Sequence, residues 1–183
     1  MALLVAPGVA NAATQPHSAI TSNQAADSQS LWVALCDADG PCLNMTNPVD
    51  GGAVTMFTYG STDSYESIDY ELSDVYGCEH VTDTCPFKAT DFDSGFWGDP
   101  VITINSTVWG GCIDAYPSTD LEYNSCTKDR SVWVLDGNTL YSPYWTNQYG
   151  QAYVLYGPPL GDQAYVWSSE GLTREEWTAR ALS

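Results

Sequence analysis

The chain has 183 residues, of which 44% are hydrophobic and only 15% are charged. This length suits one compact domain with a sizeable core, and the hydrophobic share excludes a disordered chain. Acidic residues number 23 against 5 basic ones, so the formal net charge is -18. Such a surface repels polyphosphates and anionic lipids, which argues against nucleic-acid binding and membrane-surface binding. The same acidity is compatible with cations and with neutral partners such as sugars.

The first 30 residues have the pattern of an export signal followed by a polar lead. In residues 1–12 an apolar "ALLV" precedes Ala10-Asn11-Ala12, which fits a signal-peptidase site, although the usual basic segment is missing. We therefore expect a signal-peptide remnant and a secreted protein, with an ordinary flexible tail as the alternative. Residues 13–30 are rich in Ser, Ala and Gln and predict a disordered lead. No run of about 18 apolar residues occurs, so the sequence predicts no membrane span.

From residue 31 onward, short runs of aromatic and β-branched residues alternate with Gly, Pro, Asp and Asn. This pattern predicts one all-β domain over 31–183, either a barrel of short strands or, as the alternative, a β-sandwich. Asp136-Gly137-Asn138 is typical of a hairpin turn. Residues 172–182 suit either a helix or a final strand. The expected strands are 30–36, 53–59, 67–72, 100–109, 121–126, 131–136, 139–145, 152–157 and 163–169.

Six cysteines form three close pairs in the sequence: Cys36/Cys42, Cys78/Cys85 and Cys112/Cys126. An even count in an exported chain favours disulfides, and we prefer local pairing among the fifteen connectivities that six cysteines allow. Zinc binding is the competing interpretation. It is less favoured because no pair has CxxC spacing and the only histidines are His17 and His80.

Two segments share one pattern, which indicates internal repetition. Residues 40–60 and 110–126 each contain Gly or Pro, then Cys, an aliphatic residue, Asn or Asp, a turn and a second strand. Residues 153–177 suit a third, degenerate copy without cysteines. Three copies of a four-strand unit predict a closed β-trefoil, in which closure removes exposed sheet edges.

Residues 108–142 resemble one repeat of the ricin-type (R-type) β-trefoil lectins and related carbohydrate-binding modules. Cys112-Ile113-Asp114 matches the opening of that repeat, Cys126 its loop-closing cysteine, and Trp133 the tryptophan of its Gln-x-Trp ending. The Gln-x-Trp triplet itself is absent, and Asn44 stands where the first copy would carry the aspartate. The resemblance therefore implies a β-trefoil-like barrel, while these departures leave open whether sugar binding has been lost.

The resemblance also implies a sugar site around Asp114. In that family the aspartate accepts hydrogen bonds from two sugar hydroxyls, and a nearby aromatic ring stacks on the sugar. On this chain the stacking candidates are Tyr116 and Tyr123, and Asn124 is a second polar contact. The alternative is that Asp114 caps its own turn through a bond to the backbone.

Two acidic segments raise the question of calcium. Residues 36–42 and 90–99 each contain Asp-x-Asp followed closely by Gly, and oxygen ligands at alternating positions suit Ca²⁺. Neither segment completes the EF-hand pattern, so we expect solvated acidic turns. Calcium at Asp91, Asp93 and Asp99 remains the alternative, and no other metal or cofactor is expected.

Three functions are consistent with these features. The first is a secreted, monomeric, non-catalytic lectin-like protein that binds a glycan or polysaccharide. The second is a secreted structural or protein-interaction protein with the same fold and no sugar site. The third is a small secreted carbohydrate-active enzyme that uses two carboxylates. No GxSxG, HExxH or phosphate-loop motif is present, so an enzyme is the less favoured expectation.

Overall fold

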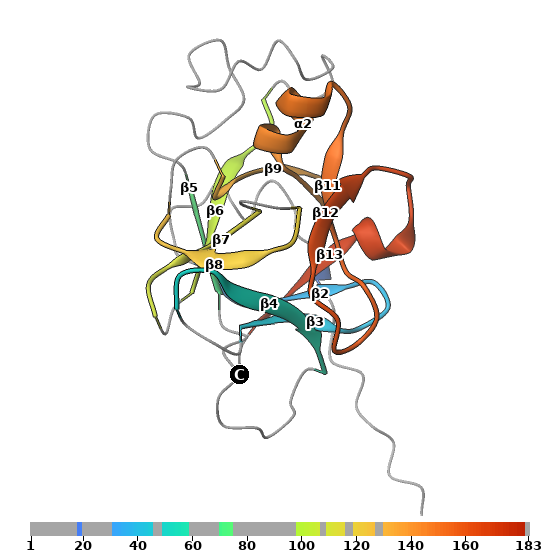
Figure 1. The fold of residues 1–183 in the computed structure, drawn as a ribbon. Helices are drawn as coiled ribbons and strands as arrows, with labels where there is room; N and C mark the ends of the chain where they lie inside the picture. The colour runs from blue at the N-terminus through green and yellow to red at the C-terminus, as the bar shows by residue number, and fades with distance from the viewer. Residues whose placement is uncertain are drawn as a thin grey trace, which may run out of the picture.

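The computed structural model describes residues 18–19, 31–45, 49–58, 70–74, 98–106, 109–115, 119–126 and 130–181. In this part of the chain a short strand, β1 (Ser18–Ala19), precedes three repeats of four strands each (Figure 1). The first repeat contains β2 (Leu31–Asp37), β3 (Cys42–Met45), β4 (Gly52–Phe57) and β5 (Tyr70–Asp74). The second contains β6 (Val101–Ser106), β7 (Cys112–Asp114), β8 (Glu122–Asn124) and β9 (Val132–Asp136). The third contains β10 (Thr139–Tyr141), β11 (Tyr153–Tyr156), β12 (Tyr165–Ser168) and β13 (Trp177–Ala181).

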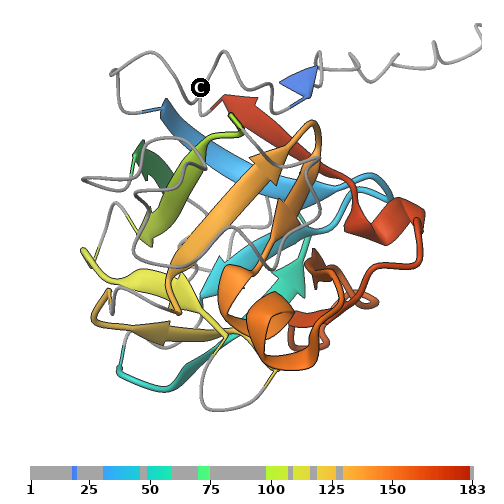
Figure 2. The ribbon, with the colours of Figure 1, turned by 90° about the horizontal axis from the view of Figure 1, so that it is seen from above.

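The first and fourth strands of the repeats form a barrel, which Figure 2 shows around a common centre. β2 pairs with β13 and β5, β6 pairs with β5 and β9, and β10 pairs with β9. The ring closes where the Trp177 backbone N–H donates to the Asn138 carbonyl at 2.7 Å. Each strand of this ring therefore has a neighbour on both sides, which protects the backbone groups that an open sheet edge would expose.

The second and third strands of each repeat form hairpins that meet at one end of the barrel. Their contact is a closed triangle of backbone hydrogen bonds among Val54, Leu121 and Ala164. Val54 N–H donates to Leu121 O at 3.1 Å, Leu121 N–H to Ala164 O at 2.7 Å, and Ala164 N–H to Val54 O at 2.8 Å. All three residues are fully buried. The triangle defines equivalent positions in the three repeats and confirms the predicted β-trefoil, including the third copy without cysteines.

A buried aromatic residue at the start of the fourth strand fills the core in each repeat. Tyr70, Trp133 and Trp177 occupy this position and are fully buried. The indole N–H of Trp133 donates to Ile113 O at 3.2 Å, and that of Trp177 donates to Leu155 O at 3.0 Å. A buried indole N–H needs such a partner. The two bonds join the second and fourth strands of the second and third repeats in the same way.

Two expected elements differ in the structure. The strand expected over 139–145 ends at Tyr141, and α2 (Pro143–Tyr149) follows. Pro143 suits the first turn of a helix because its fixed φ is helical and its missing N–H would have no helical partner. The helix ends at Gly150, whose φ of 66° is left-handed. The segment 172–182 resolves into the 3₁₀ turn η3 (Thr173–Glu175) and the strand β13.

Within the expected polar lead, the structure describes only Ser18 and Ala19, which pair with Ala179 and Thr178 of β13. The remainder of residues 1–30, including the expected signal-peptide remnant at 1–12, lies outside the described residues. In the described part of the chain, no helix has the length and apolar character needed to cross a membrane.

Candidate functional site

A disulfide between Cys112 and Cys126 closes the β7–β8 hairpin, as the local pairing predicts. The bond joins the first residue of β7 to a residue just beyond β8 and encloses the segment that contains Asp114. A second disulfide joins Cys36 and Cys42, also as predicted. The third expected pair, Cys78 and Cys85, lies outside the described residues.

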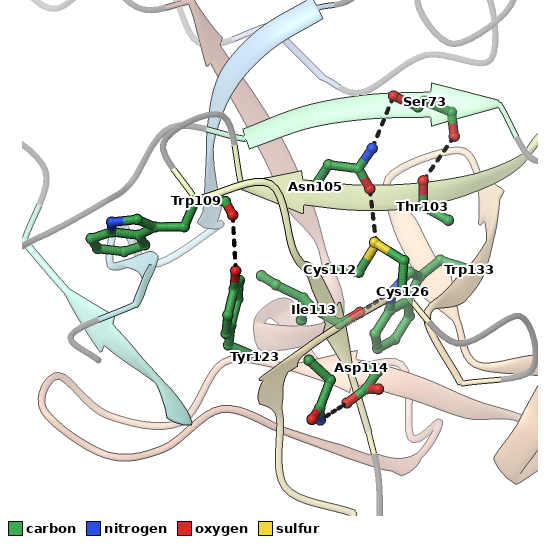
Figure 3. The surroundings of a disulfide bond; sticks show 11 residues. Ser73, Thr103, Asn105, Trp109, Cys112, Ile113, Asp114, Tyr123, Cys126 and Trp133 are labelled. Carbon is green, nitrogen blue, oxygen red and sulfur yellow. Dashed lines mark hydrogen bonds between the residues drawn. A yellow bond between two sulfur atoms is a disulfide. The ribbon is translucent and has the colours of Figure 1, made fainter. Parts of the chain in front are cut away.

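Polar side chains anchor this hairpin to the barrel (Figure 3). The Asn105 amide on β6 donates through Nδ2 to Ser73 Oγ on β5 at 3.2 Å. Its Oδ1 lies 3.0 Å from the Cys112 sulfur. That sulfur carries no proton because it belongs to the disulfide, so this is a close contact and not a hydrogen bond. Thr103 Oγ1 adds a bond to the Ser73 carbonyl at 3.4 Å. These contacts connect the β7–β8 hairpin, through Cys112, to the barrel strands β5 and β6.

Asp114 and Asn124, both expected in the site, come together across the hairpin. Asn124 Nδ2 donates to Asp114 Oδ1 at 2.7 Å. Asp114 pairs in register with Glu122 and Asn124 with Cys112, so these side chains share one face of the two strands. The side chain of Asp114 is thus bonded to the opposite strand, while residues 116–118 of its own turn lie outside the described residues. Asp114 is only 1% exposed.

Burial is the main influence on the ionisation of Asp114, and it raises the pKa of this carboxyl to about 6. The Asn124 hydrogen bond opposes the shift because it stabilises the charged form. The negative charges of Glu122 and Asp50 raise the pKa further, and the positive charge of Arg130 lowers it. At neutral pH Asp114 is therefore a largely ionised and buried hydrogen-bond acceptor.

Tyr123 does not share the face of Asp114 and Asn124. Successive residues of a strand point to opposite faces, so Tyr123 points away from Asn124. Its hydroxyl donates to Trp109 O at 3.1 Å and the residue is 8% exposed (Figure 3). Its ring packs so closely on Gly111 that a Cβ there would lie 2.2 Å from a ring carbon. In this structure Tyr123 fills the hairpin from inside, and Tyr116 lies outside the described residues.

Equivalent hairpin positions in the three repeats carry different side chains. The position of Asp114 is taken by Asn44 in the first repeat and by Tyr156 in the third, as the hairpin registers show. Asn44 is fully buried, and within the described residues neither its Oδ1 nor its Nδ2 has a hydrogen-bond partner. In the third repeat Tyr156 instead packs against Tyr165. Sequence reasoning missed this aromatic face, although the alternation of "AYVWS" could have indicated it.

The acidic segment 36–42 also differs from expectation. Asp37 is only 3% exposed, so the expected solvated turn is wrong for this residue. Its Oδ1 accepts the Gly40 N–H at 2.9 Å, and burial raises its pKa to about 6. Asp39 is exposed and pairs with Arg174 Nε at 3.1 Å. The loop is thus held by the hydrogen bond between Gly40 and Asp37 and by the ion pair between Asp39 and Arg174 of the third repeat.

The calcium hypothesis concerns residues that the structure covers only in part. Asp91 and Asp93 lie outside the described residues, and Asp99 precedes β6. Among the described residues, no group of three His, Cys, Asp or Glu side chains could hold a metal ion. Calcium at these aspartates therefore stays an untested alternative.

No family model matches this chain, and no curated protein matches it. Several solved structures do. The β-trefoil lectin of the Vibrio vulnificus hemolysin/cytolysin, with N-acetyl-D-lactosamine bound, is 16% identical with a TM-score of 0.58, covering 85% of this chain and 98% of that one. The C-half of the earthworm R-type lectin in complex with GalNAc is 13% identical with a TM-score of 0.54, covering 82% and 99%. ThreeFoil, a designed threefold-symmetric protein, is 14% identical with the same TM-score and coverage. At these identities the likeness shows the fold, and the chain is a β-trefoil protein.

Proposed function

We propose that this protein is a secreted, non-catalytic carbohydrate-binding protein whose site is the β7–β8 hairpin. The observation that carries the proposal is the 2.7 Å hydrogen bond between Asn124 and Asp114 on a disulfide-closed hairpin of a β-trefoil. Two lectins with this fold, whose structures contain GalNAc and N-acetyl-D-lactosamine, support it.

The chemistry of the pair suits sugar hydroxyls. An ionised carboxylate accepts hydroxyl hydrogen bonds that are stronger than those of a neutral acceptor. Asn124 orients the Asp114 carboxylate through Nδ2, and its own carbonyl oxygen is a further acceptor. Glu122 adds a second carboxylate on the same face. Tyr116 is the proposed stacking ring, and Tyr123 supports the site from within the hairpin.

The burial of Asp114 favours a second candidate function. At 1% exposure, the carboxylate meets a sugar only if the groups that cover it move aside. In the second candidate the Asp114–Asn124 bond merely ties two strands together, and the protein is a secreted structural or protein-interaction β-trefoil. A ligand titration separates these functions.

The two disulfides support secretion, because such bonds persist in oxidising compartments outside the cytosol. The proposed partner is a glycan or a polysaccharide, bound by a single copy of the chain. The high negative charge makes an anionic glycan a poor partner, because the surface would repel it.

The test is isothermal titration calorimetry with N-acetylgalactosamine and N-acetyl-D-lactosamine, after a glycan array has widened the choice of sugars. The variant is Asp114→Asn, and the matched control is Asp136→Asn, which neutralises an exposed carboxylate on β9. We expect Asp114→Asn to weaken binding at least about tenfold, the usual value of a hydrogen bond to a charged group. Asp136→Asn should leave binding unchanged. If no glycan binds the wild type, the second candidate function replaces the first.

A further inference from the structure

The outer face of the β11–β12 hairpin carries three aromatic side chains, Tyr156, Tyr165 and Trp167. The Tyr156 and Tyr165 rings lie 5.0 Å apart between centroids and are tilted by 31°. The Trp167 ring lies 6.1 Å from Tyr165 and is nearly perpendicular to it, at 84°. Trp167 is 48% exposed, although a tryptophan side chain normally gains from burial. The three rings are therefore set at angles to one another and do not form one flat surface. We call Tyr156, Tyr165 and Trp167 together the aromatic corner.

A carboxylate is placed at the edge of this aromatic corner. The Trp167 indole N–H points to Glu170 Oε1 at 3.5 Å. The loop that carries Glu170 is pinned by Glu175, which is 3% exposed. Glu175 accepts hydrogen bonds from Glu170 N–H at 2.8 Å, Gly171 N–H at 3.0 Å and Ser169 Oγ at 3.0 Å. This buried carboxylate thus fixes the backbone that positions the exposed one.

The electrostatic surroundings of the aromatic corner are acidic. Asp120 is exposed, and its backbone lies beside that of Tyr165 in an isolated antiparallel β-bridge. The charge of Asp162 also acts on Tyr165. Arg174 is the nearby base, and its guanidinium is already paired with Asp39 at 3.1 Å. With a net charge of -18 over the chain, this surface favours a cation.

We propose that this aromatic corner binds the protonated amino group of an amino-sugar glycan, such as a glucosamine oligomer. Aromatic rings set at an angle around a cation, with a carboxylate beside them, attract an ammonium group through cation–π and Coulomb forces. The sugar ring supplies apolar C–H faces for the remaining ring. The inference rests on the proposed carbohydrate binding, but it places a different ligand class on a different repeat. A neutral sugar could stack on the rings and donate a hydroxyl hydrogen bond to Glu170, but it would lack the Coulomb and cation–π attraction that an ammonium group adds.

The experiment compares glucosamine, N-acetylglucosamine and glucose oligomers of equal length by calorimetry at physiological salt. Trp167→Ala removes the most exposed ring, and Tyr149→Ala, which removes an aromatic residue exposed to a similar extent on α2, is its matched control. Glu170→Gln removes the local charge, and Glu176→Gln removes an identical exposed charge elsewhere on the chain. We expect wild type to prefer the glucosamine oligomer over both uncharged oligomers.

Trp167→Ala should weaken glucosamine binding by about 3- to 30-fold, and Glu170→Gln by about two- to fivefold. Both controls should bind as wild type does. No glucosamine binding by wild type, or equal losses in Glu170→Gln and Glu176→Gln, would overturn the inference. Asp114→Asn separates the two proposals: if it abolishes sugar binding while Trp167→Ala changes nothing, the proposed function stands and this inference fails. The reverse pattern would uphold the aromatic corner and remove the β7–β8 site.

Discussion

Replacing Asp114 by Asn should stabilise the protein at neutral pH. The carboxyl has a pKa of about 6 in the folded state against an ordinary value of 3.8, so the folded protein binds this proton more tightly than the unfolded chain. The ionised group therefore opposes folding at neutral pH, by about 3 kcal/mol for a pKa difference of this size. Asparagine keeps the acceptor for Asn124 and removes the charge. We expect a gain that approaches this value.

The raised pKa also determines how the free energy of unfolding changes with pH. In wild type the free energy of unfolding should fall as the pH rises from 3.8 to about 6, because over this range the unfolded chain has released the proton that the folded state still binds. Asp37, whose pKa is also about 6, contributes a similar decline. Of the decline that these two groups cause, Asp114→Asn should remove roughly half and Asp37→Asn the other half. Below pH 3.8 the gain from Asp114→Asn should vanish.

The assay is equilibrium urea denaturation, followed by tryptophan fluorescence with disulfides intact, at a series of pH values from about 4 to about 7. If the Asp114→Asn variant is less stable than wild type at neutral pH, or if its free energy of unfolding falls with pH as steeply as that of wild type, the Asp114 carboxylate does not oppose folding. A stabilised variant would show that the native carboxylate costs stability. Such a cost is expected of a residue that binds a ligand, and not of a residue whose side chain only links two strands.

Three further predictions concern packing, and urea denaturation checks each of them. Gly111→Ala should cost at least about 1–3 kcal/mol, because the new methyl would overlap the Tyr123 ring. Trp133→Phe should cost about 1–3 kcal/mol, because Ile113 O loses its buried donor. Asn44→Leu should raise the free energy of unfolding by about 1–3 kcal/mol, because it removes a buried amide without a partner among the described residues.

For each of these three predictions one outcome would contradict the reason given. If Gly111→Ala is as stable as wild type, Tyr123 leaves its place without loss and does not hold the hairpin. A neutral Trp133→Phe would mean that the indole bond contributes nothing to joining the strands. A destabilised Asn44→Leu would show that this amide has a partner beyond the described residues.

Much of the fold could be predicted from the sequence because turns and cysteines mark the repeats. The turn at Asp136-Gly137 joins β9 and β10 as expected, with a left-handed φ of 58° at Gly137. The helix α2 was missed because its seven residues show no periodic apolar pattern. It is held by packing, including a 2.6 Å bond from the buried Trp145 indole N–H to Ala115 O. Pro143 and Gly150 at its ends were the available signal.

The candidate site was predicted in part. Asp114 lies two residues after Cys112 and Asn124 two residues before Cys126. A disulfide between these cysteines therefore brings the two side chains close together, as the structure shows. The alternation of side chains in a strand separates Tyr123 from Asn124, and that rule was available from the sequence. The aromatic face of the third repeat was missed, although the alternation of "AYVWS" within the predicted third copy could have indicated it. The backbone triangle at Val54 then shows which of its positions are equivalent to those of the other hairpins.

Sugar binding at the β7–β8 hairpin can be observed through the side-chain amide signals of ¹⁵N-labelled protein. N-acetyl-D-lactosamine and N-acetylgalactosamine would be titrated while the Nδ2 signals of Asn124 are followed by NMR. We expect saturable shifts of the Asn124 signals that are absent in the folded Asp114→Asn variant. If the Asn124 signals do not move even in a large excess of sugar, sugar does not bind at this hairpin, and the disulfide-closed hairpin has a structural role only.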